Sequence, residues 1–201
     1  MFQTHTPLRL VFKKWKLIFV FGLLAAILSG GISLLFPLQY RADAQVLIIS
    51  QSRYGVDPYT VVRSAERVGE NIAQVMKTDD FYNKVKEQKN YEIDWNYFEN
   101  KNEREKRKLW QKTLVPSVVY GTGVLNVSAF HKDPDVAKKI ANAASESLVA
   151  KGWEYVGGDV NIKIVNQAVV TKFPVRPNIL MNVVLGFLVG MFFMSLLVVR
   201  K

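Results

Sequence analysis

Few side chains in this sequence could take part in catalysis, and they do not form a recognisable catalytic pattern. Neither of the two histidines, His5 and His131, stands in an HExxH or paired-histidine pattern of the kind that binds a metal ion. Cysteine is absent, which excludes thiol nucleophiles and Cys-ligated metal sites. We therefore expect a protein that is not an enzyme and that has no cofactor and no catalytic or metal-binding residues.

The paired carboxylates and the glycine-rich segment have structural explanations. Asp79-Asp80 and Asp133-Pro134-Asp135 each stand where a helix is expected to begin, and a carboxylate there caps the helix and complements its dipole. Gly121-Thr122-Gly123 separates two runs rich in β-branched residues, which predicts the turn of a hairpin rather than a phosphate-binding loop. None of these segments therefore indicates an active site.

Two long apolar runs without any charge lie near the ends of the chain of 201 residues. They cover residues 17–36 and 178–199, and at about 1.5 Å per residue each helix would be about 30 Å long, the thickness of a hydrocarbon core. We expect transmembrane helices over residues 17–37 and 178–199. A cleaved signal peptide is the alternative for the first run, but that run exceeds the roughly 7–15 apolar residues of a signal peptide.

The distribution of charged residues predicts the orientation of these helices. All 17 acidic residues lie between Asp43 and Asp159, whereas six of the 27 basic residues flank the apolar runs on short tails, four at the N-terminus and two at the C-terminus. Short positively charged flanks remain in the cytoplasm. We therefore expect residues 1–16 and 200–201 to be cytoplasmic and residues 38–177 to form one extracytoplasmic domain. We expect no nucleic-acid partner, despite an isoelectric point near 9.7.

The segment between the apolar runs predicts an α+β domain with the order strand, helices, hairpin, long helix, strand. Apolar residues in alternation predict strands, and apolar residues that recur every three or four positions predict helices. The first and last strands are expected to pair in one sheet. The expected elements are a strand over 40–50, a turn at 54–58, a helix with an apolar face from Val61 to Val75, a short helix after Thr78, hairpin strands over 115–120 and 124–130, a helix from Asp133 to a break at Gly157-Gly158, and a half-buried strand over 160–164.

One stretch of the domain is strongly basic. Residues 99–112 contain six basic and three acidic side chains, and only Leu109 and Trp110 are apolar. Such a stretch could bind an anionic polymer, but charges of mixed sign along a helix are typical of a solvent-facing surface. We favour the solvent-facing helix and expect an i,i+4 pair between Glu103 and Arg107 to support it.

Small residues recur within both apolar runs. Gly22, Ala26 and Gly30 are spaced four apart, and Gly186 and Gly190 form a GxxxG pair, so each set lies on one face of its helix. Helices in lipid associate by close packing over such residues. We expect these faces to bring the spans together, within one subunit or between subunits. The alternative is that glycine is simply frequent in membrane helices.

Three further features complete the layout. The strand Tyr40-Arg41-Ala42-Asp43-Ala44 directly follows the first apolar run, and Pro174 and Pro177 precede the second. Over about residues 11–200 this layout resembles the chain length determinant (Wzz-type) family, the polysaccharide co-polymerases of bacterial surface polysaccharide export. The third feature is a helix start after the hairpin that matches the family pattern at Asp133, Pro134, Ala137, Ala141 and Asn142.

The resemblance implies a non-enzymatic regulator of the chain length and export of a surface polysaccharide: capsule, exopolysaccharide or O-antigen-like. Proteins of this family work in the bacterial cytoplasmic (inner) membrane as ring-like homo-oligomers, with a membrane polysaccharide polymerase and the glycan chain as partners. The expected external domain, residues 38–177, is too small for the tall helical hairpin of the O-antigen regulators. We therefore expect a member of the capsule or exopolysaccharide branch.

Other functions remain open at this point. The chain ends at Lys201, soon after the second apolar run, so we expect no fused kinase domain. The resemblance still allows a separate cytoplasmic tyrosine kinase as a partner, which makes a kinase activator or adaptor one alternative. A structural subunit of another envelope complex is the second alternative, because similarity of fold alone does not establish function.

Overall fold

The computed structural model describes residues 7–50, 57–156 and 160–200. The chain divides into two compact units, one made of Met1–Leu38 with Val175–Lys201 and the other of Gln39–Pro174. The first unit is helical, whereas the second combines helices with a four-stranded sheet, so the fold is of mixed α+β type with an apolar helix near each end.

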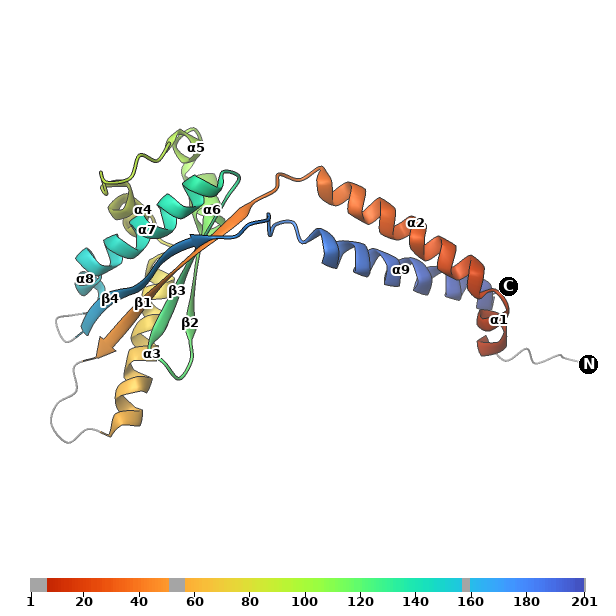
Figure 1. The fold of residues 1–201 in the computed structure, drawn as a ribbon, viewed down its shortest axis with the longest axis horizontal. Helices are drawn as coiled ribbons and strands as arrows, with labels where there is room; N and C mark the ends of the chain where they lie inside the picture. The colour runs from red at the N-terminus through yellow and green to blue at the C-terminus, as the bar shows by residue number, and fades with distance from the viewer. Residues whose placement is uncertain (1–6, 51–56, 157–159, 201) are drawn as a thin grey trace, which may run out of the picture. The chain divides into compact units, whose positions relative to one another are not determined.

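Two long apolar helices lie side by side in the helical unit (Figure 1), and by length and composition each could span a membrane. The first of them begins two residues before the predicted span and ends at Leu34, because a proline, here Pro37, disfavours the helical conformation of the residue before it. A short helix before it was not predicted. The helices of this unit are α1 (Pro7–Lys13), α2 (Trp15–Leu34) and α9 (Ile179–Arg200).

The sheet of the second unit is antiparallel, with the strand order β2-β3-β1-β4. Pairing of β1 with β4 confirms that the first and last strands of the domain share one sheet. β1 has the predicted bounds, whereas β4 continues six residues beyond the predicted end at residue 164. The strands are β1 (Tyr40–Ser50), β2 (Leu114–Val119), β3 (Val124–His131) and β4 (Val160–Val170).

One face of the sheet is buried. Alternate residues of β1 point into the core, and their partners on β3 do the same: Ala42 pairs with Ala129, and Ala44 pairs with Val127. The predicted alternation of β4 is wrong in part, because Ile162 is buried but Ile164 is 37% exposed. β4 is an edge strand, and its pairing with β1 shifts register twice between Asp43 and Val46, which interrupts the pattern.

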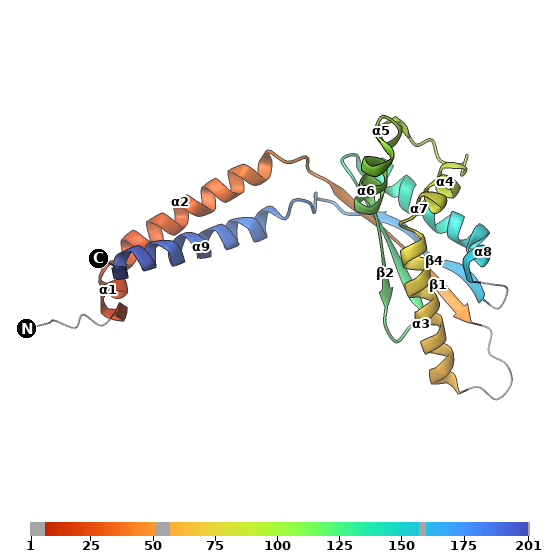
Figure 2. The same cartoon turned by 180° about the vertical axis from the view of Figure 1, so that it is seen from behind.

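Helices pack on the buried face of the sheet. α3 (Pro58–Val75) lies along β1 and β2 (Figure 2) with Ala65 and Ile72 buried, which confirms its predicted apolar face. α7 (Pro134–Lys151) packs on β4, β1 and β3 and ends sooner than predicted. The predicted Gly157-Gly158 break and most of the predicted turn at 54–58 lie outside the described residues. The remaining helices are α4 (Asp79–Lys86), α5 (Asn96–Glu99), α6 (Glu103–Thr113) and α8 (Trp153–Val156).

The predicted hairpin is confirmed, and its turn requires glycine. Gly121 and Gly123 have φ angles of +79° and +68°, a left-handed region that favours residues without a side chain. A Cβ on Gly123 would also lie 3.0 Å from the carbonyl oxygen of Ile48. The turn therefore holds the end of the hairpin close to the central strand β1.

The prediction that the basic helix α6 faces solvent is wrong in part, because one of its side chains anchors it in the core. Trp110 is fully buried, and its indole N–H donates a hydrogen bond of 2.9 Å to the carbonyl oxygen of Met76, which follows α3. The indole packs edge-on against the ring of Tyr82 at a centroid distance of 5.1 Å. Trp110 thus joins α6 to the end of α3 and to α4.

Trp110→Phe should test this anchor. The change leaves the buried Met76 carbonyl without its donor, so we expect the free energy of unfolding to fall by about 1–3 kcal/mol. Urea unfolding of the full-length protein in detergent, followed by far-UV circular dichroism, measures the change. Trp153→Phe is the control, because Trp153 is 60% exposed and its replacement should shift the value by no more than about 0.5 kcal/mol. Equal effects of the two substitutions would contradict the anchor.

Candidate functional site

The apolar helices α2 and α9 approach each other closely at the glycines of α9. A Cβ added to Gly186 would lie 2.6 Å from the Cβ of Ser29 and 3.0 Å from the carbonyl oxygen of Ala25. A Cβ added to Gly190 would lie 2.5 Å from the Cβ of Ala25. These distances are too short for carbon atoms in contact, so a larger residue at either position requires the helices to move apart.

The predicted small residues of α2 take part in the same contact to different degrees. Gly22 lies opposite Gly190, since a Cβ on Gly190 would be 3.1 Å from the Gly22 Cα, and a Cβ on Gly30 would be 3.0 Å from Val183. Ala26 is buried. The structure thus brings these residues together within one chain, and a role in contacts between subunits stays a prediction.

A polar cluster lies beside this small-residue contact. The hydroxyl of Ser29 donates to the backbone carbonyl of Asn182 at 2.8 Å, and the Asn182 side-chain amide donates to the hydroxyl of Ser33 at 2.8 Å. Ser33 in turn donates to the carbonyl of Ser29 at 2.9 Å. Hydrogen bonds between helices in lipid contribute up to about 1–2 kcal/mol each. The cluster therefore adds directional bonds to a contact that small residues make possible.

The sequence interpretation missed these polar residues, although a signal for them was present. Ser29, Ser33 and Asn182 are polar side chains within otherwise apolar runs. Polar groups in a membrane segment are costly unless they are paired, so they usually face another helix. That rule alone would have pointed to Asn182 as a contact residue of α9.

The predicted helix-start motif forms the beginning of α7. The Asp133 carboxylate accepts hydrogen bonds from the N–H groups of Asp135 at 2.8 Å and Val136 at 3.4 Å, and Pro134 occupies the first turn. This confirms the predicted N-cap.

His131 completes the connection between β3 and α7. Its Nδ1 accepts a hydrogen bond from the Asp133 N–H at 3.1 Å, and its ring meets the Tyr97 ring edge-on at 5.3 Å. Burial lowers the pKa of His131 below its usual value, because the charged form loses hydration. Burial thus favours the neutral imidazole, whose Nδ1 acts as a hydrogen-bond acceptor in the turn.

The other motif residues of α7 pack the helix on the sheet. Ala137 and Ala141 are fully buried, which lets the helix backbone come close to the strands. Asn142 accepts a hydrogen bond from the backbone N–H of Ala168 in β4 at 2.8 Å. Asn142 thus satisfies a donor of the edge strand and fixes α7 to it.

The predicted proline segment falls at the boundary between the units. Pro174 is the last residue of the sheet-containing unit, and Pro177 belongs to the helical unit, two residues before α9 begins. The Arg176–Pro177 peptide bond is cis. What these prolines contribute to function stays a prediction.

Lys106 and Arg107 of the basic stretch are paired with carboxylates. Arg107 pairs with Asp79 of α4, with its Nε 2.9 Å from the carboxylate. In the described part of the chain, the predicted i,i+4 partner Glu103 forms no ion pair with Arg107 and adds only a weaker electrostatic attraction. Lys106 lies 3.7 Å from Glu103 and 3.6 Å from Glu99. Arg107 pairs with Asp79 because Asp79, the first residue of α4, lies within reach of the Arg107 guanidinium.

Glu99 is the centre of this charged surface. It accepts hydrogen bonds from Lys86 and from the Tyr82 hydroxyl, each at 2.9 Å. The Lys86 contact, followed by that of Tyr82, holds the pKa of Glu99 below its usual value. Since Lys106 and Arg107 are bound to carboxylates, these two cations form part of a paired surface rather than a channel for an anionic polymer.

The arrangement as a whole positions helices rather than reacting groups. Within the described ranges, no group of three or more His, Cys, Asp or Glu side chains is placed to hold a metal ion. His131 and Asp133 are both used by the turn that starts α7. The α2–α9 contact, in contrast, leaves no room for a larger side chain at Gly186 or Gly190.

Gly186→Ile should disrupt the α2–α9 contact while leaving an apolar helix. Its side chain would collide with Ser29 and the backbone of Ala25, and overpacking of this kind typically costs about 1–3 kcal/mol. We expect a lower melting temperature of the full-length protein in detergent. Gly31→Ile is the matched control, because a Cβ on Gly31 has no neighbour within 4 Å. A normal melting temperature for Gly186→Ile would show that the contact does not stabilise the protein.

A comparison of the sequence with protein families found one match. Residues 8–89 match the family model described as Wzz, chain length determinant protein. The match runs from α1 through α2, β1 and α3 to the end of α4, which is less than half of the chain, and leaves the α7 motif and α9 outside. A comparison with curated proteins found no match. The N-terminal part of the chain, from the first apolar helix into the domain, is therefore similar to chain length determinant proteins.

Proposed function

We propose that this protein regulates the chain length of a surface polysaccharide and catalyses no reaction itself. The observation that carries the proposal is the match of residues 8–89 to chain length determinant proteins. The matched stretch joins the first apolar helix to the first strand of the domain, so the similarity covers the junction between the two units as well as part of each.

The proposed location is the bacterial cytoplasmic (inner) membrane, with α2 and α9 as the spans. Each helix is apolar and about as long as a hydrocarbon core is thick. Lys13 and Lys14 precede α2, Lys16 lies in its first turn, and Arg200 ends α9, so both termini would lie in the cytoplasm. The domain between the helices would then lie outside the cytoplasm.

The architecture suits a regulator that works by holding its shape. The chain enters the domain at β1 and leaves it after β4, and these strands pair along most of their length. At their ends, the Thr171 N–H donates to the Arg41 carbonyl at 2.8 Å, and the Arg41 N–H donates to the Thr171 hydroxyl at 3.2 Å. The two ends of the domain are thereby fixed to each other.

The partners that we propose are further copies of this chain in a ring-like homo-oligomer, a membrane polysaccharide polymerase and the growing glycan. A domain of this size favours a capsule or exopolysaccharide system over an O-antigen system. The pairing of α2 with α9 within one chain would leave their outer faces for contacts with other copies or with the polymerase. A separate cytoplasmic tyrosine kinase is a further partner to be tested.

Cysteine labelling in intact cells or spheroplasts should test the orientation. The chain has no cysteine, so a single one placed at Asn102 or at Thr6 reports one site each. We expect a membrane-impermeant thiol reagent to label Asn102→Cys but not Thr6→Cys, because positively charged flanks stay inside. Labelling of Thr6→Cys alone would reverse the orientation.

Loss of the gene should change the length distribution of a surface glycan on a gel. We expect the modal length to disappear in the deletion strain and to return with the wild-type gene or with Gly31→Ile. Gly186→Ile should return a broad distribution, since it disturbs the α2–α9 contact. Immunoblots of the membrane fraction show whether each variant is present.

The same experiment separates the proposed function from its alternatives. An unchanged glycan ladder together with loss of another envelope complex would support a structural subunit instead. A change in tyrosine phosphorylation without a change of modal length would support a kinase activator.

A further inference from the structure

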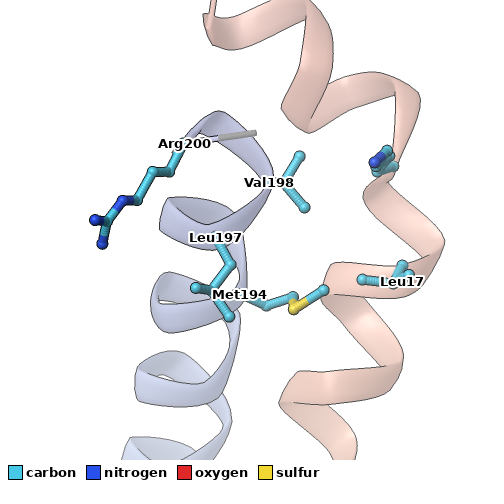
Figure 3. Close-up of a pocket in the computed structure, with 6 residues that line it drawn as sticks. Leu17, Met194, Leu197, Val198 and Arg200 are labelled. Carbon is cyan, nitrogen blue, oxygen red and sulfur yellow. The ribbon is translucent and has the colours of Figure 1, made fainter.

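A groove lies where the N-terminal end of α2 meets the last turns of α9. Its volume is about 620 Å³, within the range of about 300–1,000 Å³ that is usual for small-molecule sites. The side chains of Met194 and Val198 extend from α9 toward α2, and Leu17 faces them from α2 (Figure 3). The floor of the groove is therefore apolar.

Two cations stand at the rim of this apolar groove. Lys14 lies at the junction of α1 and α2, and Arg200 is the last residue of α9. The exposed Arg200 side chain extends from the end of α9 on the side away from α2 (Figure 3). Among the residues that the structure describes, neither cation forms an ion pair. Their charges are thus not neutralised by the described part of the chain.

The neighbouring aromatic residues indicate the depth of this groove in a bilayer. Phe12 and Trp15 are exposed on either side of Lys14. Exposed tryptophan at a span end is typical of the membrane–water interface, where long cationic side chains also reach out to the headgroups. The rim of the groove would then lie at the level of the lipid phosphates and its floor at the level of the acyl chains.

We propose that this groove is a binding site for one anionic phospholipid. The phosphate would lie at the rim beside Lys14, where the exposed Arg200 side chain would turn toward it, and an acyl chain would lie along Leu17, Met194 and Val198. A basic pocket between membrane helices attracts anionic headgroups, and a neutral lipid would lack that attraction. The occupant would also bridge α2 and α9 at the end opposite to the Ser29–Asn182 hydrogen bond.

This proposal rests only on the insertion of α2 and α9 in a membrane, which is one part of the proposed function. Lipid binding is measured on the purified protein without any glycan. Its failure would leave the regulation of chain length untouched, and an unchanged glycan ladder would leave the lipid site untouched.

Native mass spectrometry of the full-length protein in mild detergent should detect the bound lipid. The probes are phosphatidylglycerol and phosphatidylcholine with the same acyl chains. We expect wild type to bind phosphatidylglycerol more tightly than phosphatidylcholine. Each cation should account for about a five-fold difference in affinity, so Lys14→Gln with Arg200→Gln should weaken phosphatidylglycerol binding by about twenty-five-fold.

The control is Lys13→Gln with Lys16→Gln, which removes the same charge from exposed positions that do not line the groove. It should leave the affinity within about two-fold, because neither side chain lines the groove. Millimolar glycerol 3-phosphate should not displace the lipid, since it has no acyl chain for the apolar floor. Equal binding of the two lipids, an equal effect of the control, or displacement by glycerol 3-phosphate would each overturn the proposal.

Discussion

The antiparallel pairing of β1 with β4 is the constraint on which the rest of the domain depends. Arg41 and Thr171, which bond through their backbones and the Thr171 hydroxyl, are 130 residues apart in the chain. Closing so long a segment costs conformational entropy that local structure alone does not offset. The buried face of the sheet, covered by α3 and α7, supplies the compensating apolar contacts. The central position of β1, between β3 and β4, makes it the strand to which both halves of the domain attach.

Close approach through small side chains recurs in both units. In the domain, alanines of β1, β3 and α7 are buried in one core, and Asn142 of α7 reaches the backbone of Ala168. In the helical unit, Gly186 and Gly190 allow α9 to approach α2. The physical reasons differ, because alanine contacts in the domain remove apolar surface from water, whereas helices in lipid gain van der Waals contact and hydrogen bonds. A substitution that adds volume would disturb the packing in either place.

The charged residues divide into two groups with different consequences for function. Several of those in α4, α5 and α6 are paired with one another, as Arg107 with Asp79 and Lys86 with Glu99, and these pairs help to hold the helix layer together. Exposed pairs of this kind contribute little to stability individually. Lys14 and Arg200, at the ends of the apolar helices, remain without such partners among the described residues, which is the basis for assigning them to a lipid phosphate. The first group supports the domain, and the second is the group that we propose binds a lipid phosphate.

The sequence by itself determined the elements whose signals are local. Uncharged runs of helical length predicted α2 and α9, the alternation in residues 40–50 predicted β1, and Gly121 with Gly123 predicted the hairpin, because each depends on a few adjacent residues. Asp133 was predicted as a cap for the same reason.

Tertiary structure decided what depends on distant neighbours. It extended β4 through pairing with β1, buried Trp110 against Met76, gave Arg107 to Asp79, and joined Ser29 and Ser33 to Asn182. Periodicity along a chain shows which face of an element is apolar, but it does not show which distant residue that face will contact. Ser29 and Asn182 are more than a hundred residues apart, and only the packing of α2 against α9 brings them together.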